Sequence, residues 1–165
     1  MNFVIVGTNF ISDTLLDAAS TLSNFNLYGV CSRAESSAER FLANHPTHSQ
    51  AKIFTSIDAV CQDELVEAVY IAAPNSLHKD YAVQCLAAGK HVLGEKPSAA
   101  NSHELTAILT AAQKHQRLYM EAMMTTHLPN FAVLKNALKR SGTPRKFIGQ
   151  FSQYSSRYDK LKNGE

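Results

Sequence analysis

The sequence of 165 residues lacks the features that mark several classes of protein. Its lysines and arginines are scattered and form no basic stripe with interleaved aromatic residues, so nucleic acid is not an expected partner. No apolar run approaches the roughly 18 residues of a membrane span, and the N-terminus carries no basic signal region. We therefore expect a cytoplasmic protein with no membrane partner.

Cysteine is also scarce in this sequence. Cys31, Cys61 and Cys85 are odd in number, far apart and outside any Cys-x-x-Cys pair, so the sequence predicts neither a disulfide framework nor a zinc or other metal site. Reduced and mostly buried thiols are the expected state. The remaining composition is ordinary for a globular chain, with 45% hydrophobic and 18% charged residues in a length that suits one domain with a hydrophobic core.

Short β-branched and apolar runs alternate with longer helical patterns along most of the chain. This alternation requires crossover connections, and it predicts an α/β fold with a doubly wound, mostly parallel sheet. Ligands of such folds bind outside the carboxyl ends of the strands, so the loops that follow the strands are the place to look for chemistry. The expected strands are 3–6, 26–31, 52–54, 68–72, 90–93 and 117–121, and the expected helices are 11–22, 34–44, 77–88 and 103–115.

The pattern changes after Glu121. A helical pattern from about Asn130 to Lys139 is followed by residues 145–158, which we expect to form one strand. No partner for that strand remains in the sequence. The expected division is therefore a first domain of residues 1–122 and the incomplete start of a second, α+β domain in residues 123–165.

The turn after the first strand is GTNFIS, from Gly7 to Ser12, and it keeps only the first glycine of the G-x-G-x-x-G dinucleotide fingerprint. Asn9 and Ser12 replace the other two glycines. Asparagine tolerates left-handed backbone geometry, and serine is small enough to lie beside a crossing backbone. The following helix N-terminus could still bind an anion, but a plain strand-to-helix turn fits this half-motif equally well.

The loop after the second strand indicates which dinucleotide would bind. An acidic residue there would accept hydrogen bonds from the ribose 2′-hydroxyl of NAD, but the residues are Cys31, Ser32 and Arg33. A guanidinium and a hydroxyl can instead bind a 2′-phosphate, so the sequence favours NADP, with NAD as the alternative. The other interpretation of Arg33 is a solvated residue at a helix start.

The loops after the fourth and fifth strands bring polar groups to the same edge. Pro74 ends the fourth strand, Asn75 presents an amide, and His78 would lie in the first turn of the next helix, where packing or surface roles are commoner than catalysis. Glu95 and Lys96 follow the fifth strand. They could form a structural ion pair, or Lys96 could hydrogen-bond a carbonyl and assist hydride transfer.

Taken in order, these segments resemble the N-terminal part of the Gfo/Idh/MocA family of oxidoreductases, which includes glucose-fructose oxidoreductase and inositol dehydrogenase. The Glu-Lys-Pro motif with its upstream Ala-Gly-Lys-His-Val is the specific part, whereas the glycine turn alone would match many families. The last segment resembles the opening strand of the second domain in the dihydrodiol-dehydrogenase-like branch. The segments that carry the resemblance are the Gly7 turn, Ser32-Arg33, AAPNSLH at 72–78, AGKHVLGEKP at 88–97, EAMMTTHLPNF at 121–131 and QYSSRYD at 153–159.

The resemblance implies a Rossmann domain that binds a nicotinamide cofactor, and a hydride transfer to or from a sugar, polyol, dihydrodiol or related carbonyl or alcohol. Lys96 would be the catalytic residue that polarises the substrate oxygen, and Pro97 would follow a cis peptide bond. The family's second domain supplies further acid and base groups and commonly an oligomer interface, which implies a homo-oligomer. The implied cofactor-binding residues are Gly7, Thr8, Asn9, Phe10, Ile11, Ser32, Arg33, Ala73, Pro74, Asn75, His78, Glu95 and Lys96.

Two alternatives to an enzyme remain open at this point. The chain could be a non-catalytic dinucleotide-binding or redox-sensing module, or an inactive truncated remnant. Lys96 argues against a sensor, because a sensor needs no electrophile beside the nicotinamide. His127 resembles a histidine found in some family members, but a packing role at a helix start fits it equally well.

Overall fold

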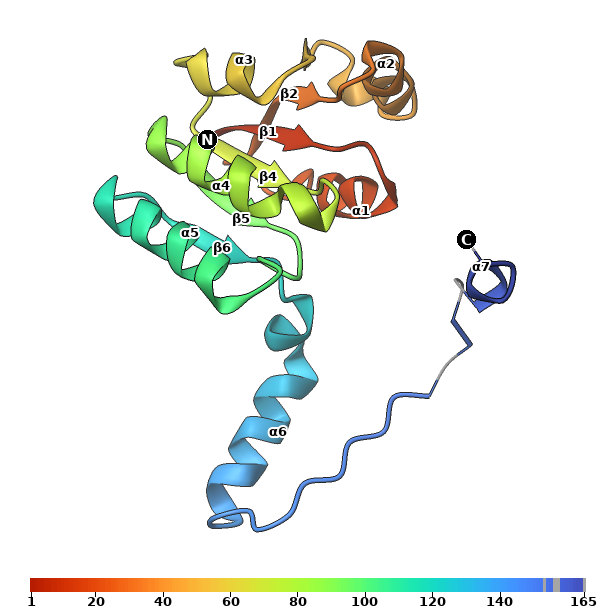
Figure 1. The fold of residues 1–165 in the computed structure, drawn as a ribbon, viewed down its shortest axis with the longest axis vertical. Coiled ribbons are helices and arrows are strands. Elements are labelled where there is room, and N and C mark those ends of the chain that lie inside the picture. The colour runs from red at the N-terminus through yellow and green to blue at the C-terminus, as the bar shows by residue number, and fades with distance from the viewer. Residues whose placement is uncertain (153, 156–157, 165) are drawn as a thin grey trace. The chain divides into compact units, whose positions relative to one another are not determined.

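A computed structural model describes residues 1–152, 154–155 and 158–164 of the chain (Figure 1). The chain divides into two compact units, Met1–Met123 and Met124–Glu165. The first unit contains the sheet and every residue of the predicted dinucleotide site. No helix among the described residues combines the length and the apolar character that crossing a membrane requires.

The first unit is built on a six-stranded sheet with the strand order β3-β2-β1-β4-β5-β6. Every neighbouring pair is parallel, so the prediction of a doubly wound, mostly parallel α/β sheet is confirmed. Starting from β1, the strands are added on one side as far as β3 and then on the other side as far as β6, so the direction of winding changes between β1 and β4. The strands are β1 (Asn2–Val6), β2 (Asn26–Cys31), β3 (Lys52–Phe54), β4 (Ala68–Ile71), β5 (His91–Gly94) and β6 (Tyr119–Glu121).

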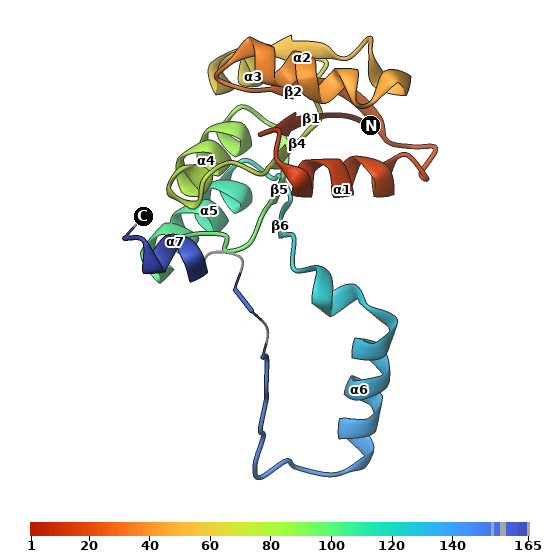
Figure 2. The same ribbon diagram turned by 90° about the vertical axis from the view of Figure 1, so that its right-hand side faces the viewer.

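Helices cover both faces of the sheet, and each face has its own hydrophobic core. One core joins α1 and α2 to the sheet through Leu16, Ala38 and Phe41. The opposite core joins α3, α4 and α5 through Val60, Leu86 and Ile108. Figure 2 shows α1 and the α4–α5 pair on opposite sides of β4 and β5. The helices are α1 (Phe10–Ala19), α2 (Glu35–Ala43), α3 (Ile57–Gln62), α4 (His78–Ala87) and α5 (Ser102–Lys114), with short 3-10 turns at Pro46–His48 and Asn75–Leu77.

The sequence did not predict α3. This helix has six residues, too few to show a helical period, and it begins at the cap residue Ser56, whose side chain accepts a hydrogen bond from Ala59 N–H at 3.2 Å. The start of α5 shows the same type of cap, where Asn101 accepts from Glu104 N–H at 2.9 Å. Local capping therefore fixes where both helices begin.

The second unit contains a 3-10 turn at Met124–His127, α6 (Pro129–Arg140) and α7 (Tyr158–Lys162). The prediction of one strand over residues 145–158 is wrong for the residues that the structure describes, because 145–152 and 154–155 are not in a strand and Tyr158 begins α7. Residues 153, 156 and 157 lie outside the described residues. A strand is stabilised by hydrogen bonds to a neighbouring strand, and the described part of this unit supplies none.

Candidate functional site

The carboxyl ends of the strands are aligned by the register of the sheet. Val6 pairs with Cys31 on one side and with Ile71 on the other. Ile71 in turn pairs with Gly94, and Gly94 with Glu121. The loops that follow these strands therefore leave the sheet at one level, as ligand binding at the edge of an open α/β sheet requires.

An open cleft of ≈ 250 Å³ lies over the ends of β1, β2 and β4. It is lined by loop residues from both branches of the sheet. No aspartate or glutamate is among them. The lining residues are Val6, Gly7, Thr8, Asn9, Cys31, Ser32, Arg33, Thr55, Ser56, Ile57, Ala72, Ala73, Pro74, Leu77 and Tyr81.

Gly7 permits the sharp turn that opens the cleft. Its φ is +102°, in the region that residues with a side chain rarely adopt. A Cβ atom built on Gly7 would lie 2.6 Å from the carbonyl oxygen of Ala72, which belongs to the backbone and cannot rotate away. Gly7 N–H donates to Cys31 O at 3.0 Å, so the turn stays bonded to the end of β2. Only glycine fits this position without moving the backbone of β1 or β4.

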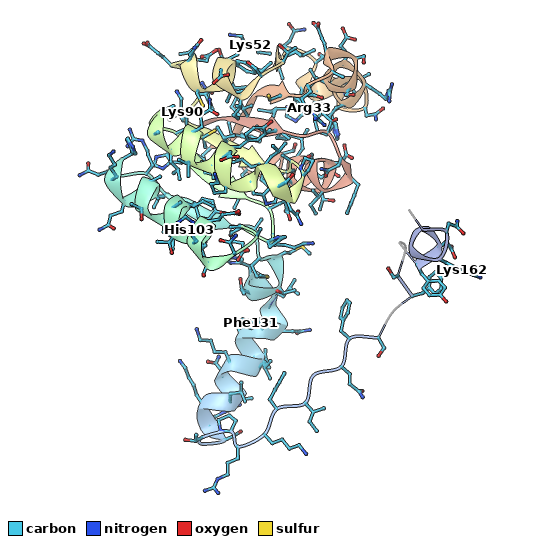
Figure 3. All side chains as sticks on the ribbon, in the orientation of Figure 1. Arg33, Lys52, Lys90, His103, Phe131 and Lys162 are labelled. Atoms are coloured by element: carbon cyan, nitrogen blue, oxygen red, sulfur yellow. The ribbon has the colours of Figure 1, made fainter. Side chains whose placement is uncertain are left out.

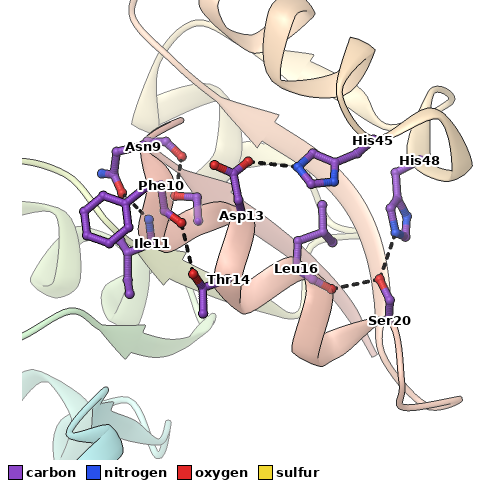
Figure 4. Close-up of polar contacts among 11 residues, drawn as sticks. Asn9, Phe10, Ile11, Asp13, Thr14, Leu16, Ser20, His45 and His48 are labelled. Carbon is purple, nitrogen blue, oxygen red and sulfur yellow. Dashed lines mark hydrogen bonds and ion pairs between the residues drawn. The ribbon is translucent and has the colours of Figure 1, made fainter.

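Asn9 is the N-cap of α1 and has a φ of −96° and a ψ of 173°. Its backbone is extended, so the left-handed geometry that asparagine tolerates is not adopted at this position. Its Oδ1 accepts from Ile11 N–H at 3.1 Å, and its Nδ2 donates to Ala72 O at 2.7 Å. Figure 4 shows the cap at the start of α1, with the ring of Phe10 beside it. Asn9 thus ties the start of α1 to the end of β4.

Ser12 occupies the position of the third fingerprint glycine. It is fully buried, and its Oγ donates to Gly7 O at 2.9 Å. The expectation of a small residue beside a crossing backbone agrees with this contact. Gly7 and Ser12 together close the turn, while Phe10 between them has 78% of its surface exposed.

The loop after β2 presents a positive charge to the cleft. Ser32 is half-buried, and its N–H donates to Phe54 O at 3.0 Å, whereas Arg33 is exposed (Figure 3). Within the described part of the chain, the Arg33 guanidinium forms no ion pair. Glu35, in the first turn of α2, does not line the cleft. The environment of Arg33 therefore suits an anionic ligand.

The loop after β5 is held by a buried tyrosine. Tyr70 donates from its hydroxyl to Glu95 Oε1 at 2.8 Å, and burial together with this carboxylate raises the pKa of Tyr70. Lys96 N–H donates to Glu95 Oε2 at 3.2 Å, but the two side chains form no ion pair. The peptide bond between Lys96 and Pro97 is cis, as the family resemblance implied. The Lys96 side chain is exposed.

His78 connects the third and fourth loops. Only 2% of its surface is exposed, its Nδ1 lies 2.7 Å from Pro97 O, and its Nε2 lies 2.8 Å from Ala73 O. Each ring nitrogen thus lies against a carbonyl oxygen, one before α4 and one in the loop after β5. His78 does not line the cleft, and a direct contact with a cofactor stays a prediction. A second hydrogen bond, from Ser98 N–H to Glu121 Oε1 at 2.9 Å, connects the loop after β5 to the end of β6.

The structure brings together seven of the predicted cofactor-binding residues in the lining of the cleft: Gly7, Thr8, Asn9, Ser32, Arg33, Ala73 and Pro74. Phe10, Ile11, Asn75, His78, Glu95 and Lys96 lie outside this lining. Sequence reasoning missed Thr55, Ser56 and Ile57, although they follow directly after β3 and the strand-end rule could have found them. It also missed Tyr81, on the second turn of α4.

Among the described residues, no cluster of histidine, cysteine or acidic side chains has the arrangement of a metal site. The three cysteines are free, with Cys31 and Cys85 buried and Cys61 partly exposed.

Comparison with known proteins identifies relatives of this chain among dehydrogenases. The chain is 43% identical over 164 residues to scyllo-inositol 2-dehydrogenase (NADP(+)) IolU of Bacillus subtilis (strain 168), a match that covers 99% of this chain and 49% of the relative. It is 32% identical over 136 residues to trans-1,2-dihydrobenzene-1,2-diol dehydrogenase of Homo sapiens, covering 81% of this chain and 40% of the relative. The chain thus spans about half the length, or less, of these curated relatives.

A similar solved structure is KijD10, a 3-ketoreductase from Actinomadura kijaniata in complex with NADP and TDP-benzene. It aligns with a TM-score of 0.77 and 25% identity over 85% of this chain and 42% of the other. Residues 1–123 match the family model described as an oxidoreductase family with an NAD-binding Rossmann fold. The resemblance read from the sequence is confirmed, and the chain belongs to the Gfo/Idh/MocA family of oxidoreductases.

Proposed function

We propose that the protein to which this chain belongs is an NADP-dependent oxidoreductase, and that the cleft over β1, β2 and β4 holds the adenosine and phosphate end of the cofactor. The observation that carries the proposal is the composition of this cleft. It combines the tight Gly7 turn at a helix start with Ser32 and Arg33, and no carboxylate lines it. A 2′-phosphate bound there could contact the Arg33 guanidinium and the Ser32 hydroxyl, and no carboxylate in the lining would repel it.

The start of α1 also favours binding of the cofactor's pyrophosphate. Backbone N–H groups at a helix N-terminus point outward and carry partial positive charge, which attracts an anion. Asn9 fixes this end of the helix through its bonds to Ile11 N–H and Ala72 O. The end of α1 is therefore held in place before any ligand arrives, which lowers the entropic cost of binding.

Lys96 is proposed as the catalytic residue. When bound, the nicotinamide supplies the hydride that is exchanged with a carbon of the substrate. The Lys96 ammonium is exposed after β5 and free of Glu95, so it can donate a hydrogen bond to the substrate oxygen as negative charge develops there. Glu95 is fixed by Tyr70, and its other oxygen accepts from the Lys96 backbone. These bonds position the loop that carries the lysine.

The proposed substrate class is a polyol, sugar, dihydrodiol or related alcohol or carbonyl compound. The names of the relatives support it, because one oxidises an inositol and another a benzene dihydrodiol. A small-molecule substrate and a homo-oligomer belong to the same proposal. So does a cytoplasmic location.

The proposal is tested by titrating NADPH and NADH into the chain and following nicotinamide fluorescence. Replacing Arg33 with alanine should weaken NADPH binding by on the order of 10-fold to 100-fold and leave NADH binding nearly unchanged, since a charged hydrogen bond is worth about 1.5–3 kcal/mol. Arg40→Ala is the matched control, because Arg40 is exposed on α2 and does not line the cleft.

Two results would contradict the proposal. If neither dinucleotide binds below millimolar concentration, the dinucleotide site is wrong. If Arg33→Ala and Arg40→Ala weaken NADPH binding equally, the preference for NADP does not arise at Arg33.

A further inference from the structure

Two of the three cysteines meet between helices on the face of the sheet that α3, α4 and α5 cover. Cys61 is in α3 and Cys85 is in α4, and a thiol hydrogen bond joins their sulfur atoms at 3.8 Å. Cys85 is fully buried, whereas Cys61 is partly exposed. The pair therefore joins a partly exposed cysteine to a fully buried one.

We propose that Cys61 and Cys85 form a peroxide-sensitive dithiol pair, and that its disulfide clamps α3 against α4 next to the cleft. A disulfide needs a sulfur–sulfur distance of about 2.05 Å, so the two sulfurs at 3.8 Å must approach by roughly 1.8 Å. Both helices belong to the first unit, so no rearrangement of the two units is needed.

The electrostatics of the pair assign a role to each cysteine. The hydrogen bond with Cys85 lowers the pKa of Cys61 and Lys90 lowers it further, whereas burial and Asp58 oppose the shift. Lys90 follows α4 and is labelled in Figure 3. It is buried, and its Nζ donates to Asp63 O at 2.7 Å, which holds the Lys90 side chain in place. The pKa of Cys85 is raised, first by its bond to Cys61 and then by burial. Cys61 is the more exposed of the two and the one whose pKa is lowered, so we assign it as the cysteine that reacts first and Cys85 as the thiol that resolves it.

The reaction balances with a peroxide as the oxidant. The Cys61 thiolate attacks one peroxide oxygen, an S–O bond forms, the O–O bond breaks, and the leaving hydroxide takes up a proton to become water. The Cys85 sulfur then attacks the sulfur of the Cys61 sulfenic acid. An S–S bond forms, the S–O bond breaks, and the departing hydroxyl leaves as water with the proton of Cys85. The two thiols lose two electrons in total and the peroxide gains them.

The position of the pair connects it to the cleft. Ile57 precedes Cys61 by one helical turn in α3, and Tyr81 precedes Cys85 by one turn in α4. Both Ile57 and Tyr81 line the cleft. Residues four apart lie on the same face of a helix, so a bond between the cysteines acts on the cleft wall directly. The six-residue α3 is a short element that can open locally, and the disulfide should suppress that opening.

The third cysteine supplies an internal control. Cys31 is buried at the end of β2, and burial, with a smaller effect of Cys61, raises its pKa to about 11. A thiol of that kind reacts slowly with peroxide, because the thiolate is the nucleophile. In one native chain, Cys61 should therefore be oxidised faster than Cys31.

The test treats the reduced full chain with hydrogen peroxide, alkylates the remaining thiols after unfolding, and maps the tryptic peptides by mass spectrometry. Lys79 lies between Cys61 and Cys85, so trypsin separates their peptides unless a disulfide links them. We expect a Cys61–Cys85 linked peptide and an alkylated Cys31. Cys31→Ser should leave the link intact, and Cys85→Ser should leave Cys61 as a sulfenic acid that dimedone traps. Three alkylated cysteines, a link through Cys31, or links only between chains would overturn the proposal.

The wild-type map decides the connectivity without relying on a variant that has to fold. Amide hydrogen exchange of the oxidised and reduced chains tests the clamp, with no dinucleotide present. Slower exchange over residues 57–62 in the oxidised chain supports it, and unchanged exchange there would overturn it. Failure of dinucleotide binding would refute the proposed function and leave both of these readouts intact.

Discussion

Gly7→Ala tests the geometry of the turn from which the whole site is built. The alanine would have to adopt a φ of +102°, which costs a residue with a side chain about 1–2 kcal/mol. Its Cβ would lie 2.6 Å from Ala72 O, and relieving a contact of that kind in a packed interior costs about 1–3 kcal/mol more. We therefore expect the free energy of unfolding to fall by about 2–5 kcal/mol, measured by urea denaturation of the chain.

Gly89→Ala is the control that separates the two contributions. Gly89 also has a positive φ, +78°, but a Cβ there would lie 3.6 Å from the nearest atom, on the Arg117 guanidinium, at an ordinary contact distance. The control should lose only the conformational part, about 1–2 kcal/mol. The excess loss in Gly7→Ala then measures the close approach of β1 to the end of β4. Equal losses in the two variants would refute the reasoning, and so would a loss below about 0.5 kcal/mol in Gly7→Ala.

Two further predictions concern polar contacts of the same unit. The pKa of Asp63 is lowered, first by its hydrogen bond from Lys52 at 2.7 Å. The ionised carboxylate therefore stabilises the fold above the pKa of an unfolded aspartate, and this stabilisation is lost as pH falls through the lower pKa of the folded state. Asp63→Asn should flatten the acid side of a plot of unfolding free energy against pH, and an unchanged plot would contradict this. His78→Leu removes the ring contacts with Ala73 O and Pro97 O and should lower the free energy of unfolding by about 2–4 kcal/mol. His103→Leu, at an exposed position, should change it by less than about 0.5 kcal/mol, and similar losses in both variants would contradict the bridging role of His78.

The strands and the location of the site could be predicted because their signals are local. An apolar run marks a parallel strand whatever surrounds it, and the loop after each strand is then known from the order of residues. Gly7, Ser32 and Arg33 follow directly from that rule. Thr55 and Ser56 follow from it equally well, since they come after β3, and applying the rule to every strand would have included them.

The expected strand over residues 145–158 shows where local signals are insufficient. Its aromatic residues are typical of a strand, but β structure depends on a neighbouring strand for its hydrogen bonds. The described residues 145–152 and 154–155 have no such neighbour and form no strand. Helices close their hydrogen bonds within themselves, which is why the predicted helix near 130–139 corresponds to α6 (Pro129–Arg140).

The contacts that fix the site could not be predicted, because most of their acceptors are backbone carbonyls. His78 bonds to Ala73 O and Pro97 O, and Asn9 bonds to Ala72 O. Every residue carries such an oxygen, so the sequence contains no signal for which one is used. The same holds for the turn itself. The backbone of Asn9 is extended, and its side-chain amide bonds to both the start of α1 and the end of β4. A glycine at this position would leave that helix and that strand unconnected. The turn is therefore not simply a weakened glycine fingerprint.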